Sequence, residues 1–351
     1  MIERKITRTV YVRGIPIGGG NPVVIQSMTN TSCDNAEAAL EQISRLKNAG
    51  CKIVRISVPD WKAVEAFKKI RSQTDMPLVA DIHFQHTLAI AAIEAGADKI
   101  RINPGNIGSN DRVKAVIDAA KQAKIPVRIG VNSGSLQKHL LEKHNGPVPM
   151  ALLESALEYM GLVEGLGFGD IVLSIKASDV VTTIEACRLL AEHTDIPQHI
   201  GITESGTVRS GSIRSSVGIG TLLAEGIGDT VRVSLAGDPV REIGVAKEIL
   251  KSLGLAKGPV VIACPTCGRT RIDVESLAEK VEALVEGIDK PIKIAVMGCV
   301  VNGPGEARDA DAGIAGGIHE GLLFVKGEPL MKVPEEKMLE ALKEQIERLV
   351  K

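Results

Sequence analysis

Three cysteines in the last quarter of the chain have the spacing of metal ligands. Cys264 and Cys267 form a C-P-T-C motif directly after a β-branched run, and Cys299 directly follows the next such run. A right-handed strand–helix–strand crossover brings the carboxyl ends of both strands to one edge of a sheet. We therefore expect the three thiols to converge on one metal site.

The spacing leaves the fourth ligand of this site open. A structural zinc would need a further Cys or His, and His319 is the only histidine downstream of the motif. An iron–sulfur cluster with three cysteines can take an oxygen ligand, and Glu306 is the available carboxylate. Spacing alone does not decide between zinc and iron. The other cysteines, interpreted as small buried hydrophobic residues, are Cys33, Cys51 and Cys187.

A second set of polar residues lies in or just after β-branched runs of the first 240 residues. Residues two apart share one face of a strand, so Asp81 and His83 should point together, as should Arg101 and Asn103. The cations of the set are Arg55, Arg101, Arg128, Lys176 and Arg232. The remaining members are Asp81, His83, Asn103, Asn132, His199, Glu204 and Ser234.

Five cations against two carboxylates predict a positive pocket. Buried cations without enough carboxylates need an anion of several charges, and arginine forks match phosphate oxygens in pairs. The pattern therefore favours a phosphorylated substrate, with a diphosphate as the best fit. The alternative is that each arginine pairs with a carboxylate of a neighbouring helix or extends its head group to solvent.

Eight short β-branched runs carry these residues, each followed by a helix-compatible stretch. The runs begin at Val23, Lys52, Pro77, Lys99, Pro126, Asp170, Gln198 and Thr230. Eight alternating units predict an α/β fold with a closed (β/α)8 barrel of the TIM type. An open doubly wound sheet is the alternative, but no G-x-G-x-x-G follows the first run. Long loops over residues 133–150 and 204–216 would lie at the mouth of the barrel.

The repeat ends near residue 250, and Lys257-Gly258-Pro259 is typical of a linker. We assign residues 1–250 to the substrate-binding barrel and residues 257–351 to a smaller α+β domain. The domain should contain a strand over 260–263, a helix over 274–286 and a strand over 292–297. A glycine-rich loop, two short strands and a terminal helix beginning at Pro334 should follow.

The amino-acid composition excludes several classes of protein. The chain has 351 residues, of which 44% are hydrophobic and 24% charged, so disordered and fibrous classes are excluded. A net charge of −1 and only seven aromatic residues argue against a nucleic-acid partner. No stretch has the apolar length of a secretion signal or a membrane span, so we expect a cytoplasmic protein without membrane contact.

Taken together, the motifs resemble the 4-hydroxy-3-methylbut-2-en-1-yl diphosphate synthase family in its short bacterial form. The resemblance covers the chain from its first residues to the last helix. In the second domain it rests on C-P-T-C at Cys264 and M-G-C-V-V-N-G-P-G-E at Met297. In the barrel it rests on A-D-I-H-F at Ala80, R-I-N-P-G-N at Arg101, R-I-G-V-N-S-G-S-L at Arg128, G-I-T-E-S-G at Gly201 and V-R-V-S-L-A-G-D-P at Val231.

The resemblance implies an oxidoreductase acting on CH or CH2 groups, with one 4Fe–4S cluster per chain in residues 257–351. It implies cluster ligands at Cys264, Cys267, Cys299 and Glu306. It implies reductive ring opening and dehydroxylation of 2-C-methyl-D-erythritol 2,4-cyclodiphosphate in isoprenoid precursor synthesis, with electrons from reduced flavodoxin or ferredoxin. A homodimer, with the cluster domain of one chain over the barrel of the other, is implied as well.

The resemblance also implies roles for the barrel residues. Those matched to the diphosphate are Arg55, Arg101, Arg128, Lys176 and Arg232. Those matched to other polar contacts with substrate are Asp81, His83, Asn103, Asn132 and Ser234. Glu204 is the candidate proton donor to the departing hydroxyl group. The residues by themselves also fit a non-redox transferase on a pteroate-synthase-like barrel with a structural zinc, or a non-catalytic sensor of a metal or phosphometabolite.

Overall fold

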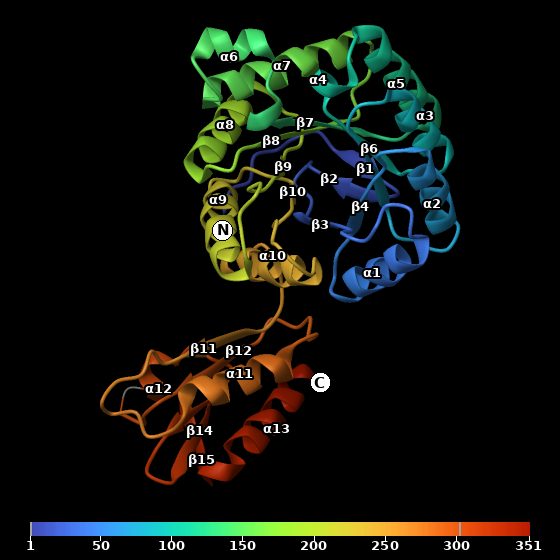
Figure 1. Ribbon diagram of the computed structural model, residues 1–351. Helices are drawn as coiled ribbons and strands as arrows, with labels where there is room; N and C mark the ends of the chain where they lie inside the picture. Colours follow the sequence, from blue (N-terminus) through green and yellow to red (C-terminus); the bar gives the residue numbers. More distant parts are fainter. Residues whose placement is uncertain (1, 302) are drawn as a thin grey trace. The chain divides into compact units, whose positions relative to one another are not determined.

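The computed structural model describes residues 2–301 and 303–351. The chain divides into two compact units, Met1–Leu255 and Ala256–Lys351. Figure 1 shows the first unit in blue to gold and the second in orange to red. The units are described separately below.

The first unit is a barrel of eight parallel strands. The strands are β3 (Val24–Met28), β4 (Ile53–Ser57), β5 (Leu78–Ile82), β6 (Lys99–Ile102), β7 (Val127–Asn132), β8 (Ile171–Lys176), β9 (His199–Ile200) and β10 (Thr230–Val231). Their order is β8-β7-β6-β5-β4-β3-β10-β9, and an isolated bridge between Leu173 and Gln198 joins the two ends. The predicted (β/α)8 barrel is confirmed.

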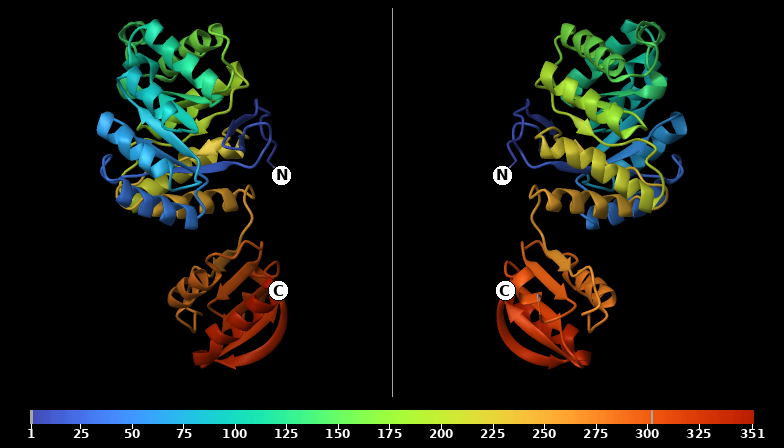
Figure 2. Two further views of the ribbon diagram at one scale, coloured as in Figure 1. Left: turned by 90° about the vertical axis from the view of Figure 1, so that its right-hand side faces the viewer. Right: turned by 90° about the vertical axis from the view of Figure 1, so that its left-hand side faces the viewer.

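Helices lie around the outside of the sheet, as Figures 1 and 2 show. They are α1 (Ala36–Asn48), α2 (Trp61–Arg71), α3 (His86–Glu94), α5 (Asn110–Ala123), α7 (Pro149–Gly165), α8 (Val180–His193), α9 (Val208–Ala224) and α10 (Val240–Ser252). Three shorter elements occupy loops at the carboxyl ends of strands: α4 (Pro104–Ile107), η1 (Ser133–Ser135) and α6 (Lys138–His144). Turns after α1 and α3 use Gly50 and Gly96 in the left-handed conformation.

A hairpin of β1 (Val10–Val12) and β2 (Ile15–Ile17) precedes the barrel. Val12 and Ile17 pack against Val24, Ile53 and Val79, which lie in the first half of their strands. The hairpin therefore closes the amino-terminal end of the barrel and leaves the carboxyl ends of the strands for the site.

Two expectations about the barrel were wrong. The loop predicted over 204–216 is shorter, because α9 already begins at Val208. Gly211 of this segment serves close packing in α9, since a Cβ there would lie 2.6 Å from Cδ2 of Leu235. Strand β10 ends at Val231, so Arg232 and Ser234 follow the strand and do not belong to it.

The second unit is a five-stranded sheet in the order β11-β12-β13-β14-β15. Its strands are β11 (Val260–Ala263), β12 (Lys293–Met297), β13 (Ala312–Gly316), β14 (Glu320–Val325) and β15 (Glu328–Pro334). The first three are parallel, and the last two pair antiparallel. Helices α11 (Val274–Val285) and α13 (Met338–Val350) share a core with the sheet, and the short α12 covers Gly303–Glu306.

Two expectations for the second unit were also wrong. Three strands, and not two, follow the glycine-rich loop. Pro334 ends β15 and does not start the terminal helix, which begins at Met338 after a 3-10 turn over Glu335–Lys337. Strand β15 is exposed at nearly every residue, so its sequence lacks the apolar alternation that marks a half-buried strand. Among the described residues, no helix is long and apolar enough to cross a membrane.

Candidate functional site

Three neighbouring strands place a carboxylate and two arginines in one row inside the barrel. Asp81 is paired with Arg101 in register, and Arg101 with Arg128. Asp81 Oδ1 lies 3.1 Å from Arg101 Nη1, and Oδ2 lies 3.4 Å from Arg55 Nε and 3.7 Å from His83 Nε2. Burial alone would raise the pKa of Asp81, but Arg55, His83, Arg101 and Arg128 together hold it well below its ordinary value. The carboxylate is therefore ionised and orients two arginines.

Arg128 is buried without a partner. It is 4% exposed, its Nε has no hydrogen-bond acceptor, and no ion pair to it occurs among the described residues. Burial and then the charges of Arg55 and Arg101 lower its pKa. For Arg55, which shares Asp81, burial lowers the pKa to about 10. The arginines therefore stand in a site with too little negative charge.

Lys176, at the end of β8, faces a neutral partner. Its Nζ lies 3.3 Å from Nε2 of the buried His199, whose Nδ1 lies 3.4 Å from Oγ1 of Thr230. Burial is the main cause that lowers the pKa of both Lys176 and His199, and the charge of Arg128 adds to it. An imidazole that accepts from Lys176 at Nε2 carries its own proton on Nδ1.

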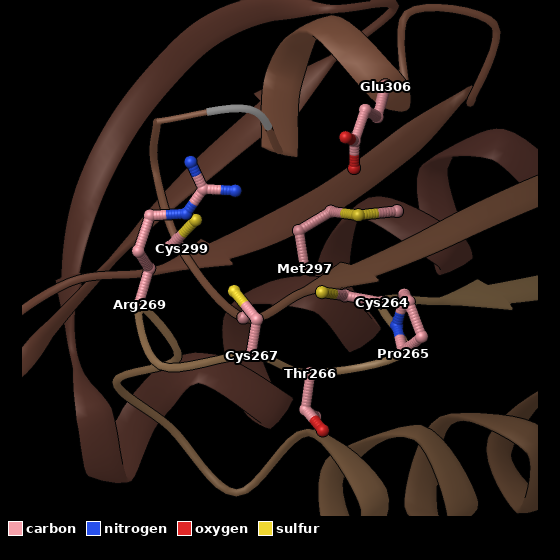
Figure 3. A pocket seen from close by; sticks show the side chains of 9 residues that line it. Cys264, Pro265, Thr266, Cys267, Arg269, Met297, Cys299 and Glu306 are labelled. Atoms are coloured by element: carbon pink, nitrogen blue, oxygen red, sulfur yellow. The ribbon is translucent and has the colours of Figure 1, made fainter.

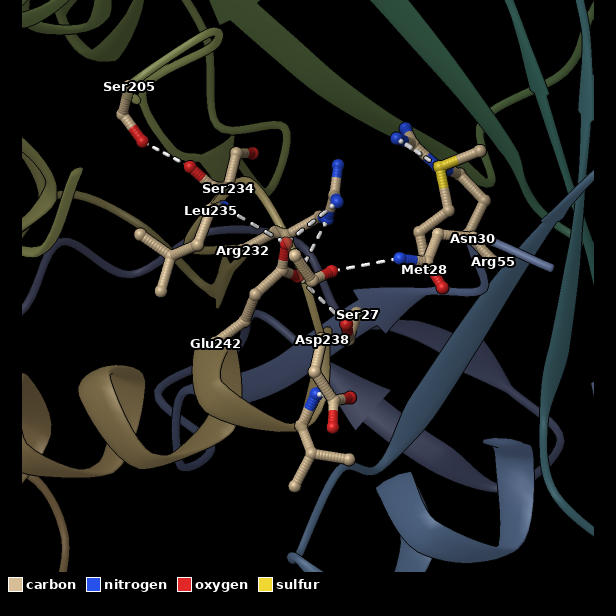
Figure 4. A network of polar contacts seen from close by, with 12 residues as sticks. Ser27, Met28, Asn30, Arg55, Ser205, Arg232, Ser234, Leu235, Asp238 and Glu242 are labelled. Atoms are coloured by element: carbon tan, nitrogen blue, oxygen red, sulfur yellow. Dashed lines mark hydrogen bonds and ion pairs between the residues drawn. The ribbon is translucent and has the colours of Figure 1, made fainter. Parts of the chain in front are cut away.

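Arg232 differs from the other cations because it has a buried carboxylate of its own. Its Nη2 lies 3.0 Å from Glu242 Oε1, and its Nε lies 3.2 Å from Oε2. Ser27 Oγ and the backbone N–H of Leu235 also donate to Glu242, at 2.8 Å and 3.2 Å. Figure 4 shows these contacts at the corner between β3, β10 and α10.

Asn103 and Asn132 connect the row of Asp81, Arg101 and Arg128 to adjacent loops. Oriented to satisfy both of its ends, the Asn132 carboxamide accepts from Arg101 Nη2 at 3.2 Å. Asn103 Nδ2 donates to Ser135 Oγ at 2.6 Å, and Asn103 Oδ1 accepts from the backbone N–H of Gly105 at 3.1 Å. Asn103 therefore caps α4 and ties two loops of the mouth together.

Ser234 and Glu204 lie apart from these pairs. Ser234 takes part through its backbone carbonyl, which accepts from the Ser205 hydroxyl. Glu204 is exposed and makes no hydrogen bond or ion pair within the described ranges. Its φ of +51° is a left-handed conformation that is costly for a residue other than glycine.

We name the side chains of Arg55, Arg101, Arg128, Lys176 and Arg232 the cation cup.

Sequence reasoning missed three buried polar residues around the cation cup. Lys99 is fully buried, with Nζ 3.5 Å from Gln26 Oε1, and shares the inward face of β6 with Arg101. His199 was noticed in its strand but given no role. Glu242 could have been found, because it shares one helix face with the apolar Ala246 and Ile249.

The cysteines line one pocket in the second unit. Because β11 and β12 are adjacent and parallel, Cys264 and Cys299 follow strands that end at the same edge. The pocket holds about 150 Å³. Figure 3 shows the three thiols and the Glu306 carboxylate around it. Its lining residues are Cys264, Pro265, Thr266, Cys267, Arg269, Met297, Gly298, Cys299 and Glu306.

The surroundings of Cys267 favour its thiolate form. The backbone N–H of Arg269 and then its guanidinium lower the pKa of Cys267. His319 follows β13 and does not line the pocket. In residues 2–301 and 303–351, no three Cys, His, Asp or Glu side chains are placed to hold a single metal ion. Asn302 of the cysteine motif lies outside the described residues.

Family models match both units of the chain. A model described as the GcpE TIM-barrel domain matches residues 7–247, and one described as the GcpE protein C-terminal domain matches residues 260–348. A relative from Caldanaerobacter subterraneus subsp. tengcongensis is 56% identical, covering 99% of this chain and 98% of its own. A relative from Shouchella clausii is 54% identical, covering 99% and 95%. Both are named 4-hydroxy-3-methylbut-2-en-1-yl diphosphate synthase (flavodoxin).

Solved structures with lower similarity share the barrel. Type I 3-dehydroquinate dehydratase from Clostridium difficile matches with a TM-score of 0.51 and 17% identity, covering 71% of this chain and 98% of its own. Dihydropteroate synthase from Yersinia pestis, solved with a sulfonamide, matches with a TM-score of 0.50 and 14% identity, covering 70% and 99%. At such identities the likeness shows a common fold alone.

Proposed function

The chain belongs to the GcpE family, and from this premise we propose how its two units carry out the family's reaction. The reaction is the reductive ring opening and dehydroxylation of 2-C-methyl-D-erythritol 2,4-cyclodiphosphate to 4-hydroxy-3-methylbut-2-en-1-yl diphosphate. The chain is thus an oxidoreductase of isoprenoid precursor synthesis. Two electrons and a proton enter, the ring C–O bond to the diphosphate breaks, and a hydroxyl group leaves as water.

The cation cup binds the diphosphate before and after ring opening. The observation that carries this proposal is Arg128, which is buried and has no anionic partner within the described residues. Ring opening frees one end of the diphosphate and adds a negative charge to it. Fixed cations stabilise that charge as it develops and keep the reacting carbons in place.

The remaining mouth residues orient the cup and the substrate. Asp81 orders Arg55 and Arg101, while His83, Asn103, Asn132 and Ser234 contribute polar contacts. Glu204 is the proposed proton donor to the departing hydroxyl. Its support is its place after β9, where a left-handed backbone holds it exposed at the carboxyl end of the barrel.

A 4Fe–4S cluster is the proposed cofactor of the second unit, held by Cys264, Cys267, Cys299 and Glu306. Three soft thiols and one carboxylate line a single pocket there, and the low pKa of Cys267 suits thiolate ligation. When bound, such a cluster supplies one-electron transfer and an iron whose carboxylate ligand can be replaced.

The electron donor is proposed to be reduced flavodoxin, with ferredoxin as the alternative, because the relatives' names specify flavodoxin. A homodimer, with each cluster-binding unit over the partner's barrel, would bring cup and cluster together. A cytoplasmic location suits a chain whose six cysteines are all free thiols.

Turnover of the cyclodiphosphate with dithionite, in protein purified without oxygen, tests the function directly. We expect brown protein containing iron and acid-labile sulfide, and an allylic diphosphate as product. Cys299→Ser should lose iron and activity, while Cys33→Ser, a cysteine outside the pocket, should keep both. Colourless protein with bound zinc and no reduction would contradict the proposal, and retained activity in Glu306→Ala would remove Glu306 as a ligand.

A further inference from the structure

We propose that Glu242 is a positioning residue for the diphosphate site. It would act by holding the Arg232 guanidinium in one orientation toward the mouth of the barrel. This inference rests on the proposed binding of the diphosphate in the cation cup. It adds a residue on the last barrel helix to a site whose other members lie in strands or directly after them.

Glu242 makes enough hydrogen bonds to fix the orientation of the Arg232 guanidinium. The side chain comes from the first turn of α10, is 2% exposed, and receives four hydrogen bonds. Arg232 approaches it side-on through Nε and Nη2, at 3.2 Å and 3.0 Å. Nη1 of Arg232 has no acceptor among the described residues, so that end of the fork is available to an anion.

Arg232 depends on a side-chain partner for its orientation more than Arg101 and Arg128 do. Arg101 and Arg128 are held by strands of four and six residues that pair on both sides, whereas β10 pairs over two residues and ends before Arg232. Beyond β10 single hydrogen bonds hold the backbone, beginning with the Arg232 N–H, which donates to the Ile200 carbonyl at 3.1 Å. Among them are the Ala236 N–H donating to the Gly206 carbonyl at 2.9 Å and the Leu235 N–H donating to Glu242. Without the carboxylate, the long arginine side chain would sample several rotamers.

The rival interpretation is that Glu242 only stabilises the corner where β10 meets β3. A matched control separates the two roles. Asp229 is equally buried, at 2% exposed, and accepts from Arg4 Nη2, Thr7 Oγ1 and the Gln198 N–H at 3.0, 3.1 and 3.0 Å. It directly precedes β10, on the side of the barrel away from the mouth. Asp229→Asn should therefore reduce stability without changing the cation cup.

The test measures binding of the cyclodiphosphate to the full chain by calorimetry, with KM and kcat alongside. Glu242→Gln should raise Kd and KM about 10- to 100-fold and lower kcat by a smaller factor, because Arg232 binds the diphosphate in the substrate and also stabilises the charge that develops on it. Asp229→Asn should lower the melting temperature and leave Kd unchanged. Equal Kd values for folded Glu242→Gln and the original protein would overturn the inference.

A double-mutant cycle shows whether the effect passes through Arg232. In an Arg232→Met background, Glu242→Gln should cost little further affinity, since no guanidinium remains to be oriented. Additive losses would overturn the inference. If Glu242→Gln does not fold, Glu242→Met combined with Arg232→Met replaces the pair by apolar groups and should match the affinity of Arg232→Met. If the original protein itself does not bind the cyclodiphosphate, the proposed function fails, and not merely the role of Glu242.

Discussion

At the scale of single residues, the barrel mouth keeps positive charges that its own carboxylates do not balance. Asp81 forms ion pairs with Arg55 and Arg101, and Glu242 forms an ion pair with Arg232. Arg128 and Lys176 have no carboxylate partner in the described part of the chain. Such an arrangement lowers stability in exchange for affinity toward an anion.

Arg128→Met should therefore stabilise the protein while it weakens binding. Removing a buried, unpaired cation is expected to raise the free energy of unfolding by about 1–3 kcal/mol, and Kd for the cyclodiphosphate should rise about 100-fold. Urea unfolding and calorimetry measure the two effects. The control is Arg71→Met, which breaks a partly buried pair with Asp98 at 2.7 Å and should reduce stability with binding intact. A loss of stability in Arg128→Met would contradict the argument.

Anion binding should be accompanied by proton uptake. Burial and neighbouring cations lower the pKa of Lys176 and His199 in the protein without ligand, so both groups release protons at lower pH than they would in water. A bound diphosphate stabilises the protonated forms and raises both pKa values. Affinity should consequently fall as pH rises from the lowered pKa of each group in the free protein toward its higher pKa in the complex.

Calorimetry in buffers of different ionisation enthalpy measures this uptake directly. Lys176→Met should reduce the number of protons taken up per ligand bound. An uptake of zero across this pH range would show that Lys176 and His199 do not change their protonation on binding.

At the scale of elements, close packing around the short strands β9 and β10 determines where Lys176 and Arg232 lie. Gly201 follows β9 between two members of the cation cup, and a Cβ there would lie 2.3 Å from the Arg232 carbonyl oxygen and 2.8 Å from Lys176 Nζ. A backbone oxygen cannot move aside as a flexible side chain can. The absence of a side chain at Gly201 therefore allows β9 and the segment after β10 to approach each other.

Gly201→Ala should lower the free energy of unfolding by about 1–3 kcal/mol through overpacking, and it should weaken cyclodiphosphate binding as well. The matched control is Gly220→Ala in α9, where a Cβ would meet nothing within 4 Å. That change should stabilise the helix by about 0.5–1 kcal/mol. Thermal unfolding of both variants makes the comparison, and equal effects would show that the clash at Gly201 relaxes freely.

At the scale of the whole molecule, the two units have separate sheets and separate cores. The chain as a whole carries a net charge of only −1, so the positive cup is a local feature of one unit. Because we propose binding for the first unit and electron transfer for the second, we expect that neither unit completes the reaction alone.

A fragment ending at Leu255 should fold and bind the cyclodiphosphate but not reduce it. Its strands, helices and hairpin make their packing contacts within residues 1–255. A single cooperative unfolding transition and calorimetric binding would support this expectation, and the same fragment with Arg128→Met should bind more weakly. A fragment that folds but does not bind would show that the cup needs the second unit.

The sequence alone was enough to predict the class of fold and the eight strands, and it supplied a set of candidate residues for binding an anion or a metal. The strands can be predicted because their hydrophobic periodicity is a property of residues adjacent in the chain. The candidate residues can be predicted because parallel strands end at one edge of a sheet. Only the tertiary structure decided which cations are paired, because pairing depends on residues far apart in the chain. Glu242 reaches Arg232 and Ser27 only when α10 packs beside β3. In residues 2–301 and 303–351, no packed element brings a carboxylate into an ion pair with Arg128.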